Sequence, residues 1–158
     1  MKMTQEEFLE AYAKYKNTVY SVIFNYVKNN EDANDLQQEV FIRLLKSDTE
    51  FDSDEHMKAW LIRVASNLSK NLLRDNSRIS DEPLPEEIAY SLKEDNGIFA
   101  YVLQLPEKYR IPIHLHYYEE YSTREIAQVL EIPEATVRIR LKRGRERLKK
   151  VLQKEDWL

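Results

Sequence analysis

The sequence predicts an all-α fold of two small helical domains joined by an acidic linker, and three observations support this. Apolar residues recur every three or four positions along most of the chain, as on one face of an α-helix. The 158 residues include only 2 glycines, too few for the many turns of an all-β fold. Residues 77–96 are rich in acids and contain prolines and serines, which is typical of a linker. We therefore expect domains at residues 1–76 and 97–158.

The composition is that of a soluble protein, with 42% hydrophobic and 33% charged residues. There are no cysteines, which excludes disulfides and thiolate metal sites and agrees with a reducing compartment. The chain has no apolar run long enough to cross a bilayer, and its first residues are too polar for a signal peptide. We expect a cytoplasmic protein that does not insert into a membrane.

Three helices are expected to close the first domain. Thr4 and Glu7 have the spacing of a capping box at the start of the first helix. Asn30 can cap the second helix, and the third should run over residues 54–75. The expected buried positions of the three helices are Phe8, Tyr12, Tyr15, Val19, Ile23, Tyr26, Val27, Ala33, Leu36, Val40, Phe41, Leu44, Leu45, Met57, Trp60, Leu61, Val64, Leu68 and Leu72.

The second domain should begin with a helix at residues 98–105 that Pro106 stops. A further helix is expected from there to about Tyr121, with a kink or a helix start near Pro112. The residues of these two helices that are expected to cover the helices that follow are Leu103, Leu105, Tyr109, Ile113, Leu115 and Tyr117.

Residues 122–150 have the pattern of two helices joined by a tight turn. Ser122 and Glu125 form another capping box, and Ala127 is small where a second helix must pass close. Pro133 suits the first turn of the next helix, which is strongly basic although the whole chain has a net charge of -4. This order is typical of a helix-turn-helix, whose second helix enters the DNA major groove. It favours that interpretation over a solvated basic helix at the end of a bundle.

No arrangement of residues indicates catalysis or a bound cofactor. His114 and His116 would point in different directions on a helix, so they make a poor metal pair. The acidic side chains are spread along solvated faces, and there is no glycine-rich phosphate loop. We expect neither an enzyme, nor a metal site, nor a cofactor.

Two blocks of residues together resemble one known family. The first block comprises Asp35, Gln38, Glu39, Phe41, Trp60, Leu61, Val64, Ala65 and Asn67. The second comprises Leu105, Pro106, Glu107, Lys108, Tyr109, Arg110, Glu125, Ile126, Ala127 and residues 132–141. Over nearly its whole length, the chain resembles sigma factors of the extracytoplasmic-function type (group IV of the sigma-70 family). These are initiation subunits of bacterial RNA polymerase.

The resemblance implies three binding surfaces. The polymerase-docking residues would be Asp35, Gln38, Glu39 and Ile42. The residues that hold the melted minus-10 promoter element would be Phe51, Arg63, Asn67, Lys70 and Arg74. The residues that read the minus-35 element as duplex DNA would be Thr136, Arg138, Ile139, Arg140, Lys142 and Arg143. The implied partners are core RNA polymerase and promoter DNA, and the resemblance also allows an anti-sigma protein.

Several positions depart from the family pattern. Ser66 stands where the family often has Arg, and Asn71 where it often has Asp. Glu131 replaces a common Gly in the turn, so the turn must avoid a positive φ or accept strain. Ile139 replaces a common Ser and could touch a thymine methyl group. Trp60 is expected in the core rather than as a stacking platform for a base.

Two other functions remain open at this point. The chain could be a free-standing transcriptional regulator, with an N-terminal sensor or dimerisation bundle and a helix-turn-helix that binds duplex operator DNA. It could also be a protein-interaction adaptor, which the concentrated basic helix disfavours. The exposed polar face around Gln38, coupled to the helix that carries Asn67, favours the sigma factor, because a sensor bundle would not need it.

Overall fold

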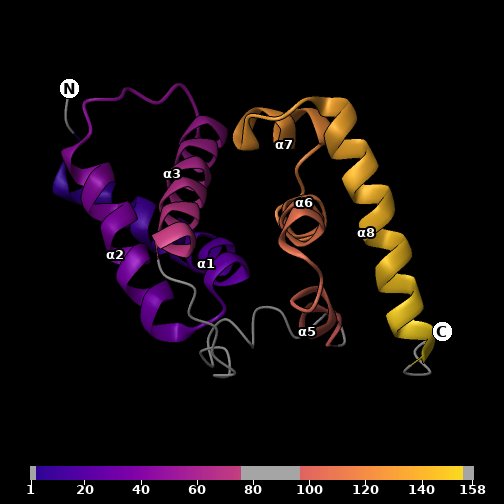
Figure 1. The fold of residues 1–158 in the computed structure, drawn as a ribbon. Helices are drawn as coiled ribbons and strands as arrows, with labels where there is room; N and C mark the ends of the chain where they lie inside the picture. Colours follow the sequence, from indigo (N-terminus) through magenta and orange to yellow (C-terminus); the bar gives the residue numbers. More distant parts are fainter. Residues whose placement is uncertain (1–2, 76–96, 155–158) are drawn as a thin grey trace. The chain divides into compact units, whose positions relative to one another are not determined.

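The computed structural model describes residues 3–75 and 97–154, and every regular element in these two stretches is a helix. The chain divides into two compact units, Met1–Pro83 and Leu84–Leu158, which are drawn in Figure 1. The all-α prediction is confirmed. The proposed linker at residues 77–96 lies outside the described residues.

The first unit contains helices α1 (Gln5–Val27), α2 (Asn30–Lys46) and α3 (Asp54–Asp75), each packed against the other two. The capping box before α1 is present: the Glu7 N–H donates to Thr4 Oγ1 at 3.1 Å, and the Thr4 N–H donates to Glu7 Oε1 at 2.9 Å. The cap of α2 was predicted one residue too late. Asn29 caps this helix by accepting from the Asp32 N–H at 2.8 Å.

The core of this unit differs from the prediction at the edges of the helices. Tyr12 and Leu45 were expected inside, but they are 38% and 46% exposed. On α3 the buried residues are Leu61, Ile62, Ala65, Ser66 and Ser69. Of the core residues predicted for this helix, Leu61 is buried, and the others are only half-buried, namely Met57, Trp60, Val64, Leu68 and Leu72. The buried stripe of α3 is therefore rotated toward small side chains, which allow a helix to pack at close range.

The second unit contains α5 (Ile98–Val102), α6 (Glu107–Tyr117), α7 (Thr123–Leu130) and α8 (Glu134–Lys154). Figure 1 shows α6 and α7 beside the long α8. The contact between α6 and α8 is close at Gly144, where a Cβ atom would lie 3.0 Å from Ile113 Cγ1 and 3.3 Å from Tyr109 Cβ. This glycine therefore sets the distance between the two helices.

Helix α6 is shorter than predicted, because it ends at Tyr117 and not near Tyr121. It begins immediately after Pro106, and Pro112 lies inside it rather than at a helix start. Of the residues expected to contact the following helices, Tyr117 is 52% exposed and Leu103 is half-buried. The remaining four are buried, namely Leu105, Tyr109, Ile113 and Leu115.

The connection from α6 to α7 is held by contacts of two histidines. His114 Nε2 lies 3.3 Å from Glu119 Oε2, and both side chains are buried. His116 Nδ1 lies 2.7 Å from the Tyr121 carbonyl oxygen, and the Tyr121 N–H donates to the Leu115 carbonyl at 3.0 Å. These contacts place Ser122, the cap of α7, at the start of the helix-turn-helix.

Candidate nucleic-acid and polymerase interfaces

Helices α7 and α8 form the predicted helix-turn-helix. The Glu125 N–H donates to Ser122 Oγ at 3.1 Å and the Ser122 N–H donates to Glu125 Oε1 at 2.9 Å, so the capping box is complete. Glu131 ends α7 with a φ of 58°, in the left-handed region. Of the two outcomes that the sequence left open for this turn, it therefore accepts a positive φ.

The first turn of α8 is joined to α7 through one carboxylate. Glu134 Oε1 accepts from Thr123 Oγ1 at 2.9 Å and from Arg138 Nη1 at 2.9 Å. This network orients Arg138 along its own helix. The guanidinium still has donors to offer, because it carries five N–H groups and its side chain is 59% exposed.

The six predicted minus-35 residues do not share one face of α8. With about 3.6 residues per turn, Ile139 lies at the middle of the exposed side, between Lys142 and Arg143. Ile139 is 50% exposed, and its two neighbours are exposed as well. Thr136 and Arg140 are half-buried on the flank beyond Arg143, whereas Arg138 is on the opposite flank. The structure therefore brings Thr136, Lys142 and Arg143 close to Ile139 and places Arg138 and Arg140 further out, on opposite flanks.

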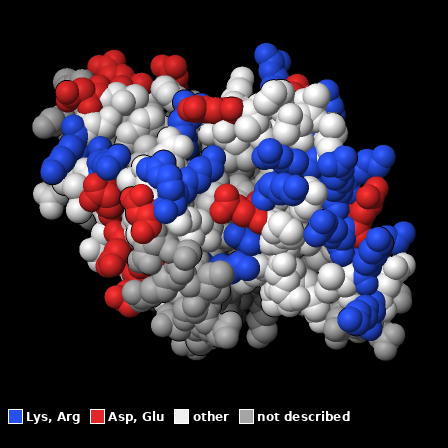
Figure 2. All heavy atoms as spheres, in the orientation of Figure 1, with Lys and Arg blue, Asp and Glu red and all other residues white. Residues whose placement is uncertain are grey.

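A cluster of cations around Tyr109 was missed by the sequence analysis. The Lys108 Nζ atom lies 5.1 Å from the centre of the Tyr109 ring, and Arg147 Cζ lies 4.9 Å from it. Figure 2 shows the wider setting, in which Lys and Arg side chains gather along α8. Sequence spacing alone could not find this cluster, because Lys108 and Arg147 are on different helices.

The predicted polymerase-docking residues do share one face of α2. Asp35, Gln38 and Ile42 are exposed and Glu39 is half-buried. Arg43 Nε donates to Glu39 Oε1 at 3.1 Å, which links the carboxylate to the next turn. Leu45, 46% exposed, extends the same face one turn beyond Ile42, which is 43% exposed. The sequence analysis did not include Leu45 in the docking face, because this apolar residue lies beside Leu44 and was assigned to the core.

Four of the predicted minus-10 residues form a narrow stripe on α3. Arg63, Asn67, Lys70 and Arg74 are all exposed and follow each other at intervals of three or four residues, so they lie one above another. Arg74 Nη2 donates to Asn71 Oδ1 at 3.2 Å. Ser66, by contrast, is only 1% exposed.

Phe51, the fifth predicted minus-10 residue, lies in the loop before α3 rather than on the stripe. Its ring meets those of His56 at 5.2 Å and Trp60 at 5.7 Å, both in edge-to-face geometry. Phe51 also lines a pocket of about 400 Å³ whose other lining residues are Met3, Glu7, Leu44, Ser47, Thr49, Glu50 and Met57. Trp60 is half-buried, two turns before Asn67 on the same side of α3, so it is both a partner of Phe51 and accessible.

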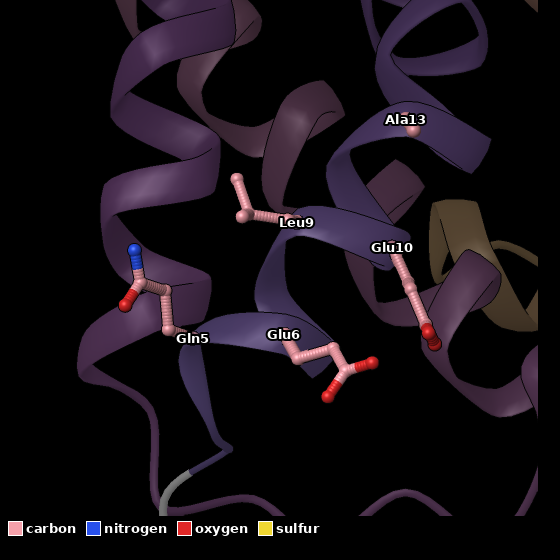
Figure 3. A pocket seen from close by; sticks show the side chains of 5 residues that line it. All are labelled: Gln5, Glu6, Leu9, Glu10 and Ala13. Carbon is pink, nitrogen blue, oxygen red and sulfur yellow. The ribbon is translucent and has the colours of Figure 1, made fainter.

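A second pocket lies against α1 alone, and no predicted site residue lines it. It measures about 510 Å³ and is lined by Gln5, Glu6, Leu9, Glu10 and Ala13. Figure 3 shows Leu9 and Gln5 pointing to one side of the helix and the two glutamates to the other. Leu9 is 55% exposed.

In the described stretches, no helix is both long and apolar enough to cross a membrane.

The fold and these surfaces define a helical protein of two units that ends in a helix-turn-helix. Residues 11–79 match the Sigma-70 region 2 family and residues 98–148 match the Sigma-70, region 4 family. The chain is 33% identical to the ECF RNA polymerase sigma factor SigW of Bacillus subtilis, over 96% of this chain and 92% of that protein. The chain therefore belongs to the extracytoplasmic-function sigma factors of the sigma-70 family, which confirms the resemblance found in the sequence.

Other known proteins agree with this family. The chain is 29% identical to the ECF RNA polymerase sigma factor SigM of Bacillus subtilis, covering 89% of this chain and 91% of that one. It is 28% identical to the ECF RNA polymerase sigma-E factor of Escherichia coli K12, covering 96% and 90%. The sigma factor RpoE of Bartonella quintana, solved with the anti-sigma factor NepR, has a TM-score of 0.70 at 16% identity, covering 94% and 98%. At this low identity it shows a shared fold.

Proposed function

We propose that this sigma factor binds bacterial core RNA polymerase, recognises the minus-35 and minus-10 promoter elements and promotes melting of the DNA. The observation that carries the proposal is that a family match over nearly the whole chain coincides with three exposed surfaces, on α2, α3 and α8. We assign polymerase docking and melting to residues 1–76, the linker to residues 77–96, and minus-35 recognition to residues 97–158.

Recognition of the minus-35 element would be the function of α8. A helix of this kind enters the major groove by its N-terminal end, where Ile139 is at the middle of the exposed side. Ile139 can pack against a thymine methyl group, and Arg143 can give two hydrogen bonds to a guanine edge or hold a phosphate. We propose Thr136 and Arg140 as contacts on the flank beside Arg143, and Lys142 and Arg138 as contacts on the opposite flank.

Melting of the minus-10 element would be the function of α3 and the loop before it. A protein opens a duplex when it binds unstacked bases better than paired ones. The stripe of Arg63, Lys70 and Arg74 offers cations to the backbone of a single strand. Asn67 lies among them and can hydrogen-bond a base edge, while Phe51, next to Trp60, offers an aromatic surface for stacking.

Polymerase docking would use the exposed face of α2. Asp35, Gln38 and Glu39 provide polar contacts, and Ile42 provides an apolar anchor of the kind that helix-on-helix recognition needs. We add Leu45 to this surface, because it extends the apolar part of the same face. We further propose a cytoplasmic location and an anti-sigma partner, since the Bartonella quintana neighbour was solved with one.

The proposal is tested by in vitro transcription with bacterial core polymerase on sheared genomic DNA, with and without this protein. Discrete transcripts that require the protein are expected, and their start sites would reveal both promoter elements. The matched control is the double variant Gln38→Ala/Glu39→Ala, which should keep its fold and lose holoenzyme assembly. If the protein alone bound a duplex operator tightly and no transcripts appeared, the stand-alone regulator would replace the sigma factor as the function.

A further inference from the structure

His56 ties the loop that carries Phe51 to the start of α3. Its Nδ1 atom accepts from the Asp52 N–H at 3.1 Å, and its own N–H donates to Ser53 Oγ at 3.1 Å. These two bonds resemble a capping box, with histidine in place of glutamate and with the side chain reaching one residue further back than usual. The loop backbone is therefore fixed to the helix at the residue next to Phe51.

The Phe51 ring is also held by two rings of α3. Its centre lies 5.2 Å from that of His56 and 5.7 Å from that of Trp60, with interplanar angles of 70° and 76°. Edge-to-face pairs at such distances are favourable. His56 and Trp60 are one helical turn apart, so they are neighbours on the same face of α3. Phe51 is half-buried in this arrangement, and part of its surface remains accessible.

The two rings continue the stripe of proposed minus-10 residues toward the start of α3. His56 lies two turns before Arg63, and Trp60 lies two turns before Asn67, on the same side of the helix. A single strand that follows the stripe therefore meets Phe51 at its N-terminal end. The place of the Phe51 ring relative to the stripe is set by its contacts with His56 and Trp60.

We infer that His56 is a positioning residue for promoter melting, because it holds Phe51 and its loop in place for an unstacked base of the minus-10 element. This inference rests on the proposed function of α3 and the loop before it. A ring that is already fixed when the base arrives loses less side-chain and loop entropy on stacking. His56 acts on the DNA through Phe51 and does not itself contact the base.

This role requires a particular protonation state of the imidazole. The hydrogen bond from the Asp52 N–H needs an unprotonated Nδ1 atom, because a protonated imidazole has no acceptor. Asp52 Oδ2 lies 3.8 Å from the same Nδ1 atom, so protonation exchanges the bond to the loop backbone for an ion pair with the Asp52 side chain. Asp54, at the start of α3, is paired with Lys14 of α1 at 2.6 Å. The other charged residues at this end of α3 and beside the loop are Glu7, Glu50, Glu55 and Lys58.

The test measures the rate of strand opening by holoenzyme on a promoter obtained from the transcription experiment. The promoter carries 2-aminopurine in its minus-10 element, and the fluorescence of this base rises when it is unstacked. His56→Phe keeps a ring and removes the acceptor, whereas His56→Asn keeps an acceptor oxygen that does not titrate. Glu55→Gln is the control, since it is exposed and lies about 100° around α3 from His56. Circular dichroism checks that each variant is folded.

At about pH 8, His56→Phe should open the promoter roughly three- to tenfold more slowly than wild type, as expected for the loss of one hydrogen bond. His56→Asn should stay closer to wild type, and Glu55→Gln should match it. Adding His56→Phe to Phe51→Ala should cause no further loss, because both changes act on the same ring. When the pH is lowered to about 6, the wild-type rate should fall relative to that of His56→Asn, since histidine ordinarily changes its charge in this range.

Three results would overturn the inference. Equal rates for wild type and His56→Phe would show that the hydrogen bond does not position Phe51. A further loss when His56→Phe is added to Phe51→Ala would show that His56 acts by another route. A ratio of wild-type to His56→Asn rates that stays constant with pH would exclude the imidazole acceptor. If assembled wild-type holoenzyme opens no promoter at all, the proposed function fails, and the inference fails with it.

Discussion

At the scale of single residues, three non-glycine positions within residues 3–75 and 97–154 adopt a left-handed backbone. Lys28, Glu120 and Glu131 each have a φ of 58°. Lys28 ends α1, Glu131 ends α7, and Glu120 lies in the connection from α6 to α7. A left-handed conformation costs an ordinary L-residue roughly 1–2 kcal/mol, and glycine avoids this cost because it has no Cβ. These turns are therefore strained positions that tertiary packing maintains.

Replacing Glu131 by glycine should relieve one of these strained positions. Glu131→Ala is the matched control, because it removes the same side chain and keeps the Cβ. We expect the free energy of unfolding of Glu131→Gly to exceed that of Glu131→Ala by about 1 kcal/mol, measured by urea denaturation. Equal stabilities would mean that the left-handed conformation at this turn is not strained.

The capping box of α1 predicts a dependence of stability on pH. The pKa of the Glu7 carboxyl lies below its ordinary value, because the carboxylate accepts hydrogen bonds from Thr4. The backbone N–H of Thr4 has the larger effect and its hydroxyl the smaller one. A lowered pKa stabilises the folded state above the ordinary glutamate pKa of about 4.3, and this stabilisation is lost as the pH falls through the lower folded value. Urea denaturation at stepwise lower pH should therefore show a smaller loss of stability for Glu7→Gln than for wild type. Parallel losses would exclude a contribution from this carboxylate.

At the scale of helices, the two adjacent leucines at the end of α2 have opposite environments. Leu44 is 1% exposed and Leu45 is 46% exposed. Leu45→Ser should change the free energy of unfolding by less than about 0.5 kcal/mol and still weaken holoenzyme assembly, measured by titration with core polymerase. Leu44→Ala is the contrasting control and should cost about 2–5 kcal/mol of stability. Normal assembly by Leu45→Ser would remove this residue from the proposed docking face.

The contact between α6 and α8 predicts an unusual effect of a glycine-to-alanine change. Inside an exposed helix, Gly144→Ala would gain about 1 kcal/mol of helix propensity. Here the new Cβ would lie 3.0 Å from Ile113 Cγ1 and 3.2 Å from Ile113 Cδ1, so overpacking should outweigh the gain and cost roughly 1 kcal/mol overall. Thermal unfolding should show that Ile113→Val, which removes Cδ1, recovers part of this loss. A stabilised Gly144→Ala would show that the helices can separate at little cost.

At the scale of the whole molecule, each of the two compact units has its own buried core. Leu61 and Ile23 are fully buried in the first unit, as Ile126 and Leu141 are in the second. We therefore expect fragments 1–83 and 84–158, produced separately, to remain helical and to unfold cooperatively. Circular dichroism during heating checks this. A fragment that loses helicity gradually would depend on the other half for its stability.

The sequence predicted the helix-turn-helix, the two capping boxes and the polar faces of α2 and α3 because these depend on neighbours within about four residues. It misplaced the cap of α2 by one residue, since Asn29 and Asn30 are both able to cap. It also placed Trp60 in the core, although this ring is half-buried against Phe51. Spacing could not distinguish these alternatives, because a residue at the border of an apolar stripe is buried or exposed according to what packs there.

The sequence by itself determined the all-α class, the family, and the order of the three proposed surfaces along the chain. These follow from local periodicity, capping and motif order. Only the tertiary structure decided that Leu45 is exposed, that Ser66 is buried, and that Lys108 and Arg147 meet at Tyr109. Such contacts join residues far apart in the chain, and their geometry is set by how closely whole helices pack, here at Gly144.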